Sequence, residues 1–172
     1  HDLDKWCKLD EFEFPPGCGW EQPFFIKSLA EEIGAKVFFE IGTGRGTACY
    51  AVSLVPSVKK IVTVDIIPYE HRMDHAIGFK NEFVANKNLF KKIPFPEKSK
   101  IRFLGTYELS PAQAEIRGKV DLCFIDGNHT DYDVIMNDFT RCLDLVTEDG
   151  VIIFDDYHSK QFAVKTVVDD II

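Results

Sequence analysis

Five short runs rich in β-branched and aromatic residues recur along this 172-residue chain, and helical patterns separate them. The runs carry apolar residues at odd and even positions alike, which is typical of parallel strands covered on both faces. The alternation of strands and helices therefore predicts an α/β fold with an open, doubly wound, mostly parallel sheet. The expected strands are Lys36–Ile41, Lys60–Ile66, Lys100–Leu104, Val120–Ile125 and Gly150–Phe154.

The segments between these runs show the apolar spacing of helices that cover both faces of the sheet. Pro56 would end one of them, and Gly34 would cap the helix that precedes the first strand. We expect an irregular N-terminal arm over residues 1–21 and a single domain over residues 22–172. The expected helices are Gln22–Ile33, Gly46–Leu54, Tyr69–Leu89, Pro111–Ile116, Asp131–Leu145 and Ala163–Ile172.

Charge is spread unevenly along the chain. The whole sequence has 28 acidic and 20 basic residues, and residues 121–172 alone hold 12 of the acidic and 3 of the basic ones. This excess argues against a nucleic-acid partner and favours a cation site in the last third. No apolar run reaches the ~18–20 residues of a membrane span. Five cysteines without a C-x-x-C pair favour a reducing compartment, so we expect a cytoplasmic protein.

The first expected strand runs into a glycine-rich turn, Glu40–Gly46 (EIGTGRG), ahead of a helix. Glycines permit a tight turn and let a ligand approach backbone N–H groups. Asp65 ends the second strand about 20 residues on, where it is suited to bind ribose hydroxyls. Thr47 stands where an NAD-binding turn has its third glycine, and Glu40 precedes the turn. Both favour S-adenosylmethionine (SAM) over NAD, although the turn could also serve only the fold.

Acidic residues follow the last two expected strands, which we expect to be neighbours. Asp126 follows the fourth strand, and Asp155 and Asp156 follow the fifth. Three such carboxylates would repel one another unless a cation joins them, and oxygen ligands suit Mg²⁺ or another hard divalent cation. The alternative is that each Asp only caps the next helix.

These motifs resemble a known family over roughly residues 35–160. The turn EIGTGRG and the downstream Asp65 resemble motif I and the second-strand acid of class I SAM-dependent methyltransferases. The pattern D-G-x-H-x-x-Y from Asp126 and the D-D-Y end of the fifth strand resemble the metal-dependent small-molecule O-methyltransferases. The similarity is greatest to the branch acting on sugar hydroxyls of macrolide and aminocoumarin antibiotics. It implies a Rossmann-like class I methyltransferase fold.

The resemblance implies a role for each group of residues. It assigns Asp126, Asp155 and Asp156 to Mg²⁺ and makes His129 the general base, while His158 would assist or bind the substrate. Thr106, after the third strand, lies where such folds meet the adenine, and Arg45 would reach the SAM carboxylate or solvent. The expected cofactor-binding residues are Glu40, Gly42, Thr43, Gly44, Gly46, Asp65, Thr106 and Asp126.

We therefore expect SAM-dependent methyl transfer to a hydroxyl of a small-molecule acceptor, assisted by Mg²⁺ and His129. The alternatives are a methyltransferase-like binding module without turnover, an NAD(P)-dependent oxidoreductase and a metal-dependent nucleotide-sugar enzyme. The family usually adds a strand hairpin after the helix at Ala163–Ile172, and this sequence lacks it. Truncation, disorder or partner chains in a homo-oligomer would account for its absence.

Overall fold

The protein is represented by a computed structural model that describes residues 21–44, 46–66, 97–105 and 109–172. In these ranges five strands form one sheet in the order β3-β2-β1-β4-β5, and each neighbouring pair is parallel. This arrangement confirms the predicted open, doubly wound sheet. The strands are β1 (Val37–Ile41), β2 (Lys60–Asp65), β3 (Ile101–Gly105), β4 (Val120–Ile125) and β5 (Val146–Phe154).

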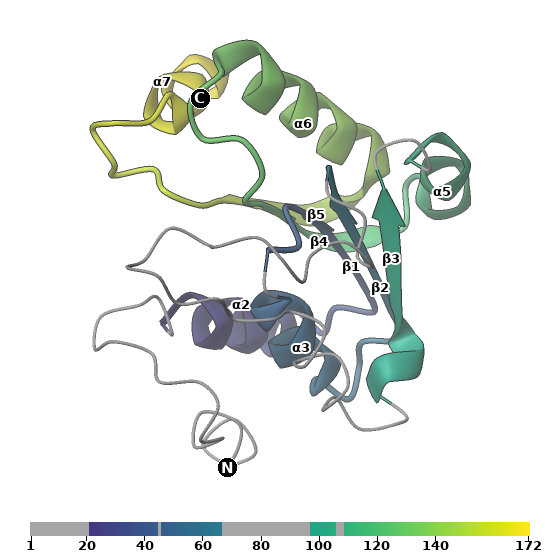
Figure 1. Cartoon of the computed structure of the whole chain (residues 1–172). Helices are drawn as coiled ribbons and strands as arrows, with labels where there is room; N and C mark the ends of the chain where they lie inside the picture. The colour runs from purple at the N-terminus through teal and green to yellow at the C-terminus, as the bar shows by residue number, and fades with distance from the viewer. Residues whose placement is uncertain (1–20, 45, 67–96, 106–108) are drawn as a thin grey trace.

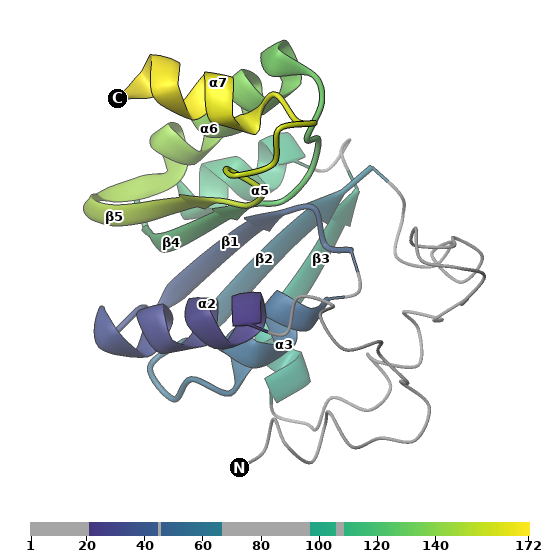
Figure 2. The same ribbon diagram turned by 90° about the vertical axis from the view of Figure 1, so that its left-hand side faces the viewer.

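Helices cover both faces of the sheet (Figures 1 and 2). One face packs against α2 and α3, and the opposite face lies under α5, α6 and α7. The predicted helix over residues 69–89 and nearly all of the predicted arm lie outside the described residues. The helices are α2 (Glu21–Glu32), α3 (Thr47–Ser53), α5 (Leu109–Ile116), α6 (Tyr132–Leu145) and α7 (Val164–Ile171), with a 3₁₀ turn η2 (Glu97–Lys100) before β3.

The core consists of two apolar layers, one on each side of the sheet. Phe38 of β1 packs in the layer under α2 and α3, and its neighbour Phe39 packs in the layer under α5 and α6. Both side chains are at most 1% exposed. Because successive residues of a strand point to opposite faces, burial on both faces produces the unbroken apolar runs seen in the sequence.

Strand β5 is longer than the sequence predicts. It begins at Val146, directly after α6, rather than at Gly150. Residues 147–149 are polar, which does not suggest a buried strand. They fit in β5 because this strand lies at the edge of the described sheet, where the side chains of Glu148 and Asp149 reach solvent. The pairing of β4 with β5 also shifts register between Val120 and Leu122.

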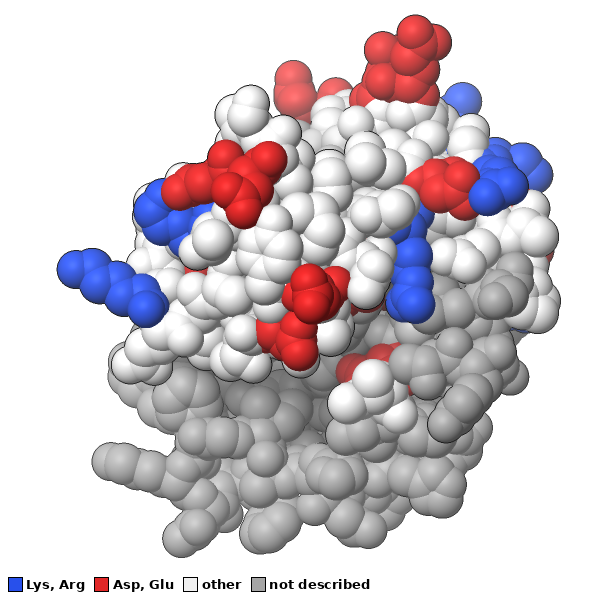
Figure 3. Space-filling view, turned by 90° about the horizontal axis from the view of Figure 1, so that it is seen from above, with Lys and Arg blue, Asp and Glu red and all other residues white. Residues whose placement is uncertain are grey.

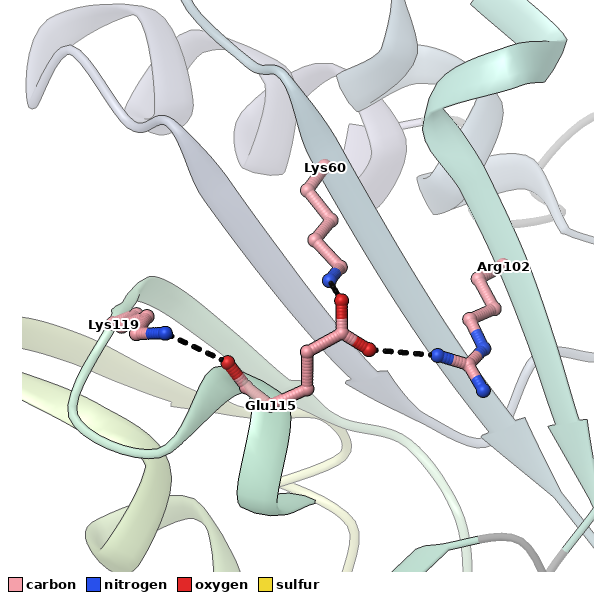
Figure 4. Close-up of polar contacts among 4 residues, drawn as sticks. All are labelled: Lys60, Arg102, Glu115 and Lys119. Atoms are coloured by element: carbon pink, nitrogen blue, oxygen red, sulfur yellow. Dashed lines mark hydrogen bonds and ion pairs between the residues drawn. The ribbon is translucent and has the colours of Figure 1, made fainter. Parts of the chain in front are cut away.

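Helix α5 is tied to β2 and β3 by an exposed group of charged residues (Figure 4). The Glu115 carboxylate accepts hydrogen bonds from Lys60 and, at 2.8 Å, from Nη1 of Arg102. These contacts lower the pKa of Glu115, and the contact with Lys60 has the largest effect. Lys119 donates to the Glu115 backbone carbonyl at 3.0 Å. Because exposed ion pairs contribute little stability, the group mainly orients α5 over the sheet.

Strands β1 and β4 meet backbone to backbone at Gly42, just past the end of β1. Asp126 N donates to Ile41 O at 2.8 Å, and Gly42 N donates to Val64 O at 2.8 Å. Gly42 has a φ of +93°, and a Cβ at this position would lie 1.9 Å from the carbonyl oxygen of Asp126. Only glycine fits here without moving the backbone.

We expect Gly42→Ala to lower the free energy of unfolding by at least about 3 kcal/mol, because the backbones of β1 and β4 would have to separate. The control is Gly44→Ala, since Gly44 has a φ of +48° but open space around a Cβ. It should cost only about 1–2 kcal/mol. Urea denaturation measures both, and equal losses would contradict the proposed backbone contact.

Candidate functional site

The glycine turn between β1 and α3 folds tightly against the end of β2. Gly42, Gly44 and Gly46 all have positive φ, at 93°, 48° and 78°. Gly46 N donates to Thr43 O at 2.6 Å, and Asp65 Oδ2 accepts from Gly44 N at 3.2 Å. The structure therefore brings together the turn and the second-strand acid that the sequence selected. Whether Asp65 also contacts a ribose stays a prediction.

A buried polar network lies behind the turn. Glu40 is only 2% exposed, and its Oε2 accepts from Thr63 Oγ1 at 2.5 Å and from Cys49 Sγ at 2.7 Å. The Thr63 hydroxyl also contacts Thr43 Oγ1 at 2.7 Å. Sequence reasoning missed Thr63 and Cys49. The one sign of a role for Thr63 in the sequence is that it is a polar residue within the apolar run of β2. Cys49 has no such sign, because a buried free thiol is common in an apolar core.

The predicted acidic residues do meet at the ends of β4 and β5, where Asp155 N donates to Ile125 O at 3.0 Å. Burial raises the pKa of Asp126 to about 9, with further contributions from the charges of Asp155 and Glu40. Burial and the charge of Asp155 also raise the pKa of Asp156. Like charges close together disfavour ionisation, so this cluster would be stabilised by a positive charge.

His129 lies within this cluster, between two carboxyl groups. Its Nδ1 is 3.3 Å from Asp156 Oδ2, and its Nε2 is 3.6 Å from Asp126 Oδ1. The imidazole also packs against the Phe162 ring at a centroid distance of 5.1 Å, and His129 O accepts from Ala163 N at 2.8 Å. Phe162 and Ala163, which lie between β5 and α7, thus contact His129 from one side. The sequence pattern did not indicate this contact of Phe162.

Helix capping does not explain the three carboxylates. Asp131 is the N-cap of α6, where its side chain accepts from the N–H groups of the next turn, and Ala163 is the N-cap of α7. Asp156 instead has a φ of 58°, the one positive φ at a non-glycine residue in the described ranges. Sparsely populated backbone conformations of this kind concentrate at functional sites.

The predicted metal ligands are not arranged as a closed ligand set. Among the described residues, no group of three or more His, Cys, Asp or Glu side chains is placed to hold a metal ion. The imidazole of His129 lies between Asp126 and Asp156, and this separates two of the three predicted ligands. The donor chemistry still fits a hard divalent cation, because carboxylate oxygens are its preferred ligands.

The remaining predicted residues fall elsewhere. Thr106 and Arg45 lie outside the described residues. His158 is exposed and packs edge-on against the Tyr157 ring, with 5.1 Å between the ring centroids. Tyr157 Oη donates to Asp169 Oδ1 at 2.8 Å, so it anchors the residue after Asp156 to that helix.

Most of the charge excess of the last third is solvated surface. On the face formed by α6 and α7, acidic side chains lie in separate groups among uncharged residues (Figure 3). These helices expose four acidic and two basic side chains, namely Asp133, Asp144, Asp169, Asp170, Arg141 and Lys165.

Residues 39–157 match the model of a family described as a methyltransferase domain. The chain belongs to this methyltransferase family. The matched range contains the glycine turn, Asp65, His129 and the carboxylates Asp126, Asp155 and Asp156. A comparison with curated protein sequences gives no match. No helix in the described ranges of this methyltransferase is long and apolar enough to cross a membrane.

Several solved structures share the fold. Cofactor-bound Rv0187 from MTB has 17% identity and a TM-score of 0.64, with 98% of this chain and 81% of that chain covered. An O-methyltransferase from Bacillus cereus, solved with SAH, has 17% identity and a TM-score of 0.61, with 98% and 67% covered. SAH-bound PaMTH1 from Podospora anserina has 21% identity and a TM-score of 0.58, with 79% and 52% covered. The class I methyltransferase fold is thereby confirmed, and the chain spans about half the length of PaMTH1.

We expect Asp126→Asn to raise the free energy of unfolding, and to do so more at pH 8 than at pH 5. The raised pKa keeps this carboxyl protonated in the folded chain, while the unfolded chain ionises above about pH 4. Stability conferred by the proton is therefore lost progressively as the pH rises from about 4 towards 9. After solvent screening, the gain at pH 8 should be about 1–3 kcal/mol.

Urea denaturation in the presence of a chelator measures this difference at both pH values. Asp149→Asn, which removes an exposed carboxyl of β5, is the control. A pH-independent effect of Asp126→Asn would contradict the raised pKa.

Proposed function

We propose that this methyltransferase binds SAM at the Glu40–Gly46 turn and transfers its methyl group to a hydroxyl of a small-molecule acceptor. One observation carries the proposal: the glycine turn contacts the backbone of Asp126 at Gly42, and the Asp126 carboxyl group lies 3.6 Å from Nε2 of His129. Two related structures support the choice of cofactor, since the Bacillus cereus enzyme was solved with SAH and TomG, an O-methyltransferase from Streptomyces achromogenes, with SAM.

The turn and Asp65 would bind two parts of the cofactor, its methionine carboxylate and its ribose. The glycines of the turn would let the SAM carboxylate approach the backbone, and Asp65 suits the ribose hydroxyls. Thr106 remains the candidate for the adenine side. When bound, SAM supplies an electrophilic methyl group on a sulfonium, which requires an oxygen nucleophile held in line with the S–CH₃ bond.

His129 would accept the proton of the acceptor hydroxyl. Histidine exchanges protons near neutral pH, and the contact of Nδ1 with Asp156 holds the ring in one orientation. After proton transfer, the neighbouring carboxyl groups would stabilise the imidazolium. Phe162 packs against the ring and limits its rotation.

Asp126, Asp155 and Asp156 would hold Mg²⁺ or another hard divalent cation. Support for this assignment comes from the raised pKa of Asp126 and of Asp156, which burial causes first and the charge of Asp155 second. When bound, the cation supplies a Lewis acid that lowers the pKa of the acceptor hydroxyl and fixes its position.

One observation favours a second candidate, a methyltransferase-like binding module without turnover. Both nitrogens of His129 face carboxyl groups in this structure, so neither is directed at an acceptor. Such a module would bind SAM and transfer nothing. An NAD(P)-dependent oxidoreductase and a nucleotide-sugar enzyme have no comparable support, since the family match is to methyltransferases.

Calorimetry tests the cofactor. We expect SAM and SAH to bind and NAD not to bind, and we expect Asp65→Ala to weaken SAM binding about tenfold through loss of charge-assisted hydrogen bonds. Asp155→Ala, at the other end of the site, is the matched control and should bind SAM as the parent chain does. Absence of SAM binding to the parent chain would refute the proposed function.

Transfer of a labelled methyl group from SAM to a panel of small hydroxyl compounds tests the chemistry. We expect Asp155→Ala to abolish turnover that depends on Mg²⁺, and His129→Gln to lower kcat about 10²- to 10⁴-fold, the usual contribution of a general base. Both should keep the SAM affinity of the parent chain, and Asp133→Asn on exposed α6 should change nothing. Unchanged kcat in His129→Gln would rule out the base, and SAM binding without any transfer would favour the binding module.

A further inference from the structure

We propose that Glu40, Thr63 and Thr43 form a buried relay that positions the glycine turn, with Thr63 as its central positioning residue. The proposal rests on the proposed SAM site and adds to it Thr63, which would act on the turn through its neighbours. Its basis is a chain of hydrogen bonds that runs from the interior of the sheet to the turn.

The hydrogen bonds of the relay have one consistent direction. Thr63 Oγ1 donates its single proton to Glu40 Oε2 at 2.5 Å. Because that proton is used, the 2.7 Å contact between the two threonines requires Thr43 Oγ1 to donate to Thr63 Oγ1. Cys49 Sγ donates to the same Glu40 oxygen from α3. The Glu40 carboxylate thus orients the Thr63 hydroxyl, which in turn fixes Thr43.

The fold dictates this arrangement. Glu40 and Thr63 are register partners in the parallel pairing of β1 with β2, so their side chains lie next to each other on the face covered by α3. All four side chains of the network are at most 4% exposed. In a buried environment each lost partner leaves an unsatisfied polar group, so the network resists rearrangement.

Through Thr43 the relay reaches the backbone that would meet the cofactor. Thr43 O accepts from Gly46 N at 2.6 Å, which closes the turn ahead of α3. With the Thr43 side chain held inward, the backbone of the turn keeps a fixed conformation. Glu40 would therefore act on the cofactor through Thr63 and Thr43.

The test uses isosteric and conservative variants of Thr63. Thr63→Val keeps the shape and β-branching of the side chain but removes the hydroxyl, and Thr63→Ser retains the hydroxyl. The matched control is Thr140→Val, since the Thr140 hydroxyl makes one exposed hydrogen bond to Met136 O on α6. Circular dichroism confirms that each variant folds.

Two quantities are measured for each variant: the Kd for SAM, and the hydrogen-exchange rates of the Gly44 and Gly46 amides without SAM. We expect Thr63→Val to weaken SAM binding roughly five- to tenfold and to speed both exchange rates by a similar factor. Thr63→Ser should restore parental values, and Thr140→Val should match them throughout. Parental exchange rates in Thr63→Val would overturn the relay.

The exchange rates separate this proposal from the proposed function. If the parent chain binds no SAM, the proposed function fails, yet faster exchange in Thr63→Val would still support the relay and unchanged exchange would still overturn it. If Thr63→Val does not fold, Thr43→Val removes the outer end of the relay and carries the same expected results. Glu40→Gln, which removes the orienting charge, should loosen the turn as Thr63→Val does.

Discussion

The site depends on one contact, the close approach of the Gly42 backbone to the Asp126 backbone where β1 and β4 end. A Cβ at Gly42 would lie 1.9 Å from the Asp126 carbonyl oxygen, so the approach exists only because glycine has no side chain. Without this approach the turn could not lie beside Asp126. In sequence, Asp126 follows Gly44 by 82 residues. The two halves of the proposed methyltransferase site meet here.

Polar groups lie on both sides of this contact, and they influence each other. Glu40 lies behind the turn in the buried network, and its charge contributes to the raised pKa of Asp126 in front. His129 lies between Asp126 and Asp156, and its interaction with Asp156 opposes the rise in the pKa of that carboxyl group. The site therefore combines a buried hydrogen-bonded network with a carboxylate cluster in front that a positive charge would stabilise.

The sequence was sufficient for the fold and for the meeting of acidic residues at the ends of β4 and β5. Each described strand was predicted, because burial on both faces leaves an apolar run, and the turn was found from its glycines. The start of β5 was missed because it contains Glu148 and Asp149. Charged residues fit in this strand because it lies at the edge of the described sheet, and the local sequence does not show which strand lies there. Thr63 and Phe162 were missed because their roles depend on strand register and on a connection that returns to His129, neither of which local sequence encodes.

A titration of the ¹⁵N-labelled chain with SAH, followed by residue-resolved amide NMR, tests the central claim most directly. The account predicts that the amides of Gly42, Gly44 and Gly46 shift most, together with that of Asp65, while amides of the exposed helix α7 stay unchanged. No shift at the turn under saturating SAH, or shifts confined to another surface, would contradict the assignment of this turn as the cofactor site.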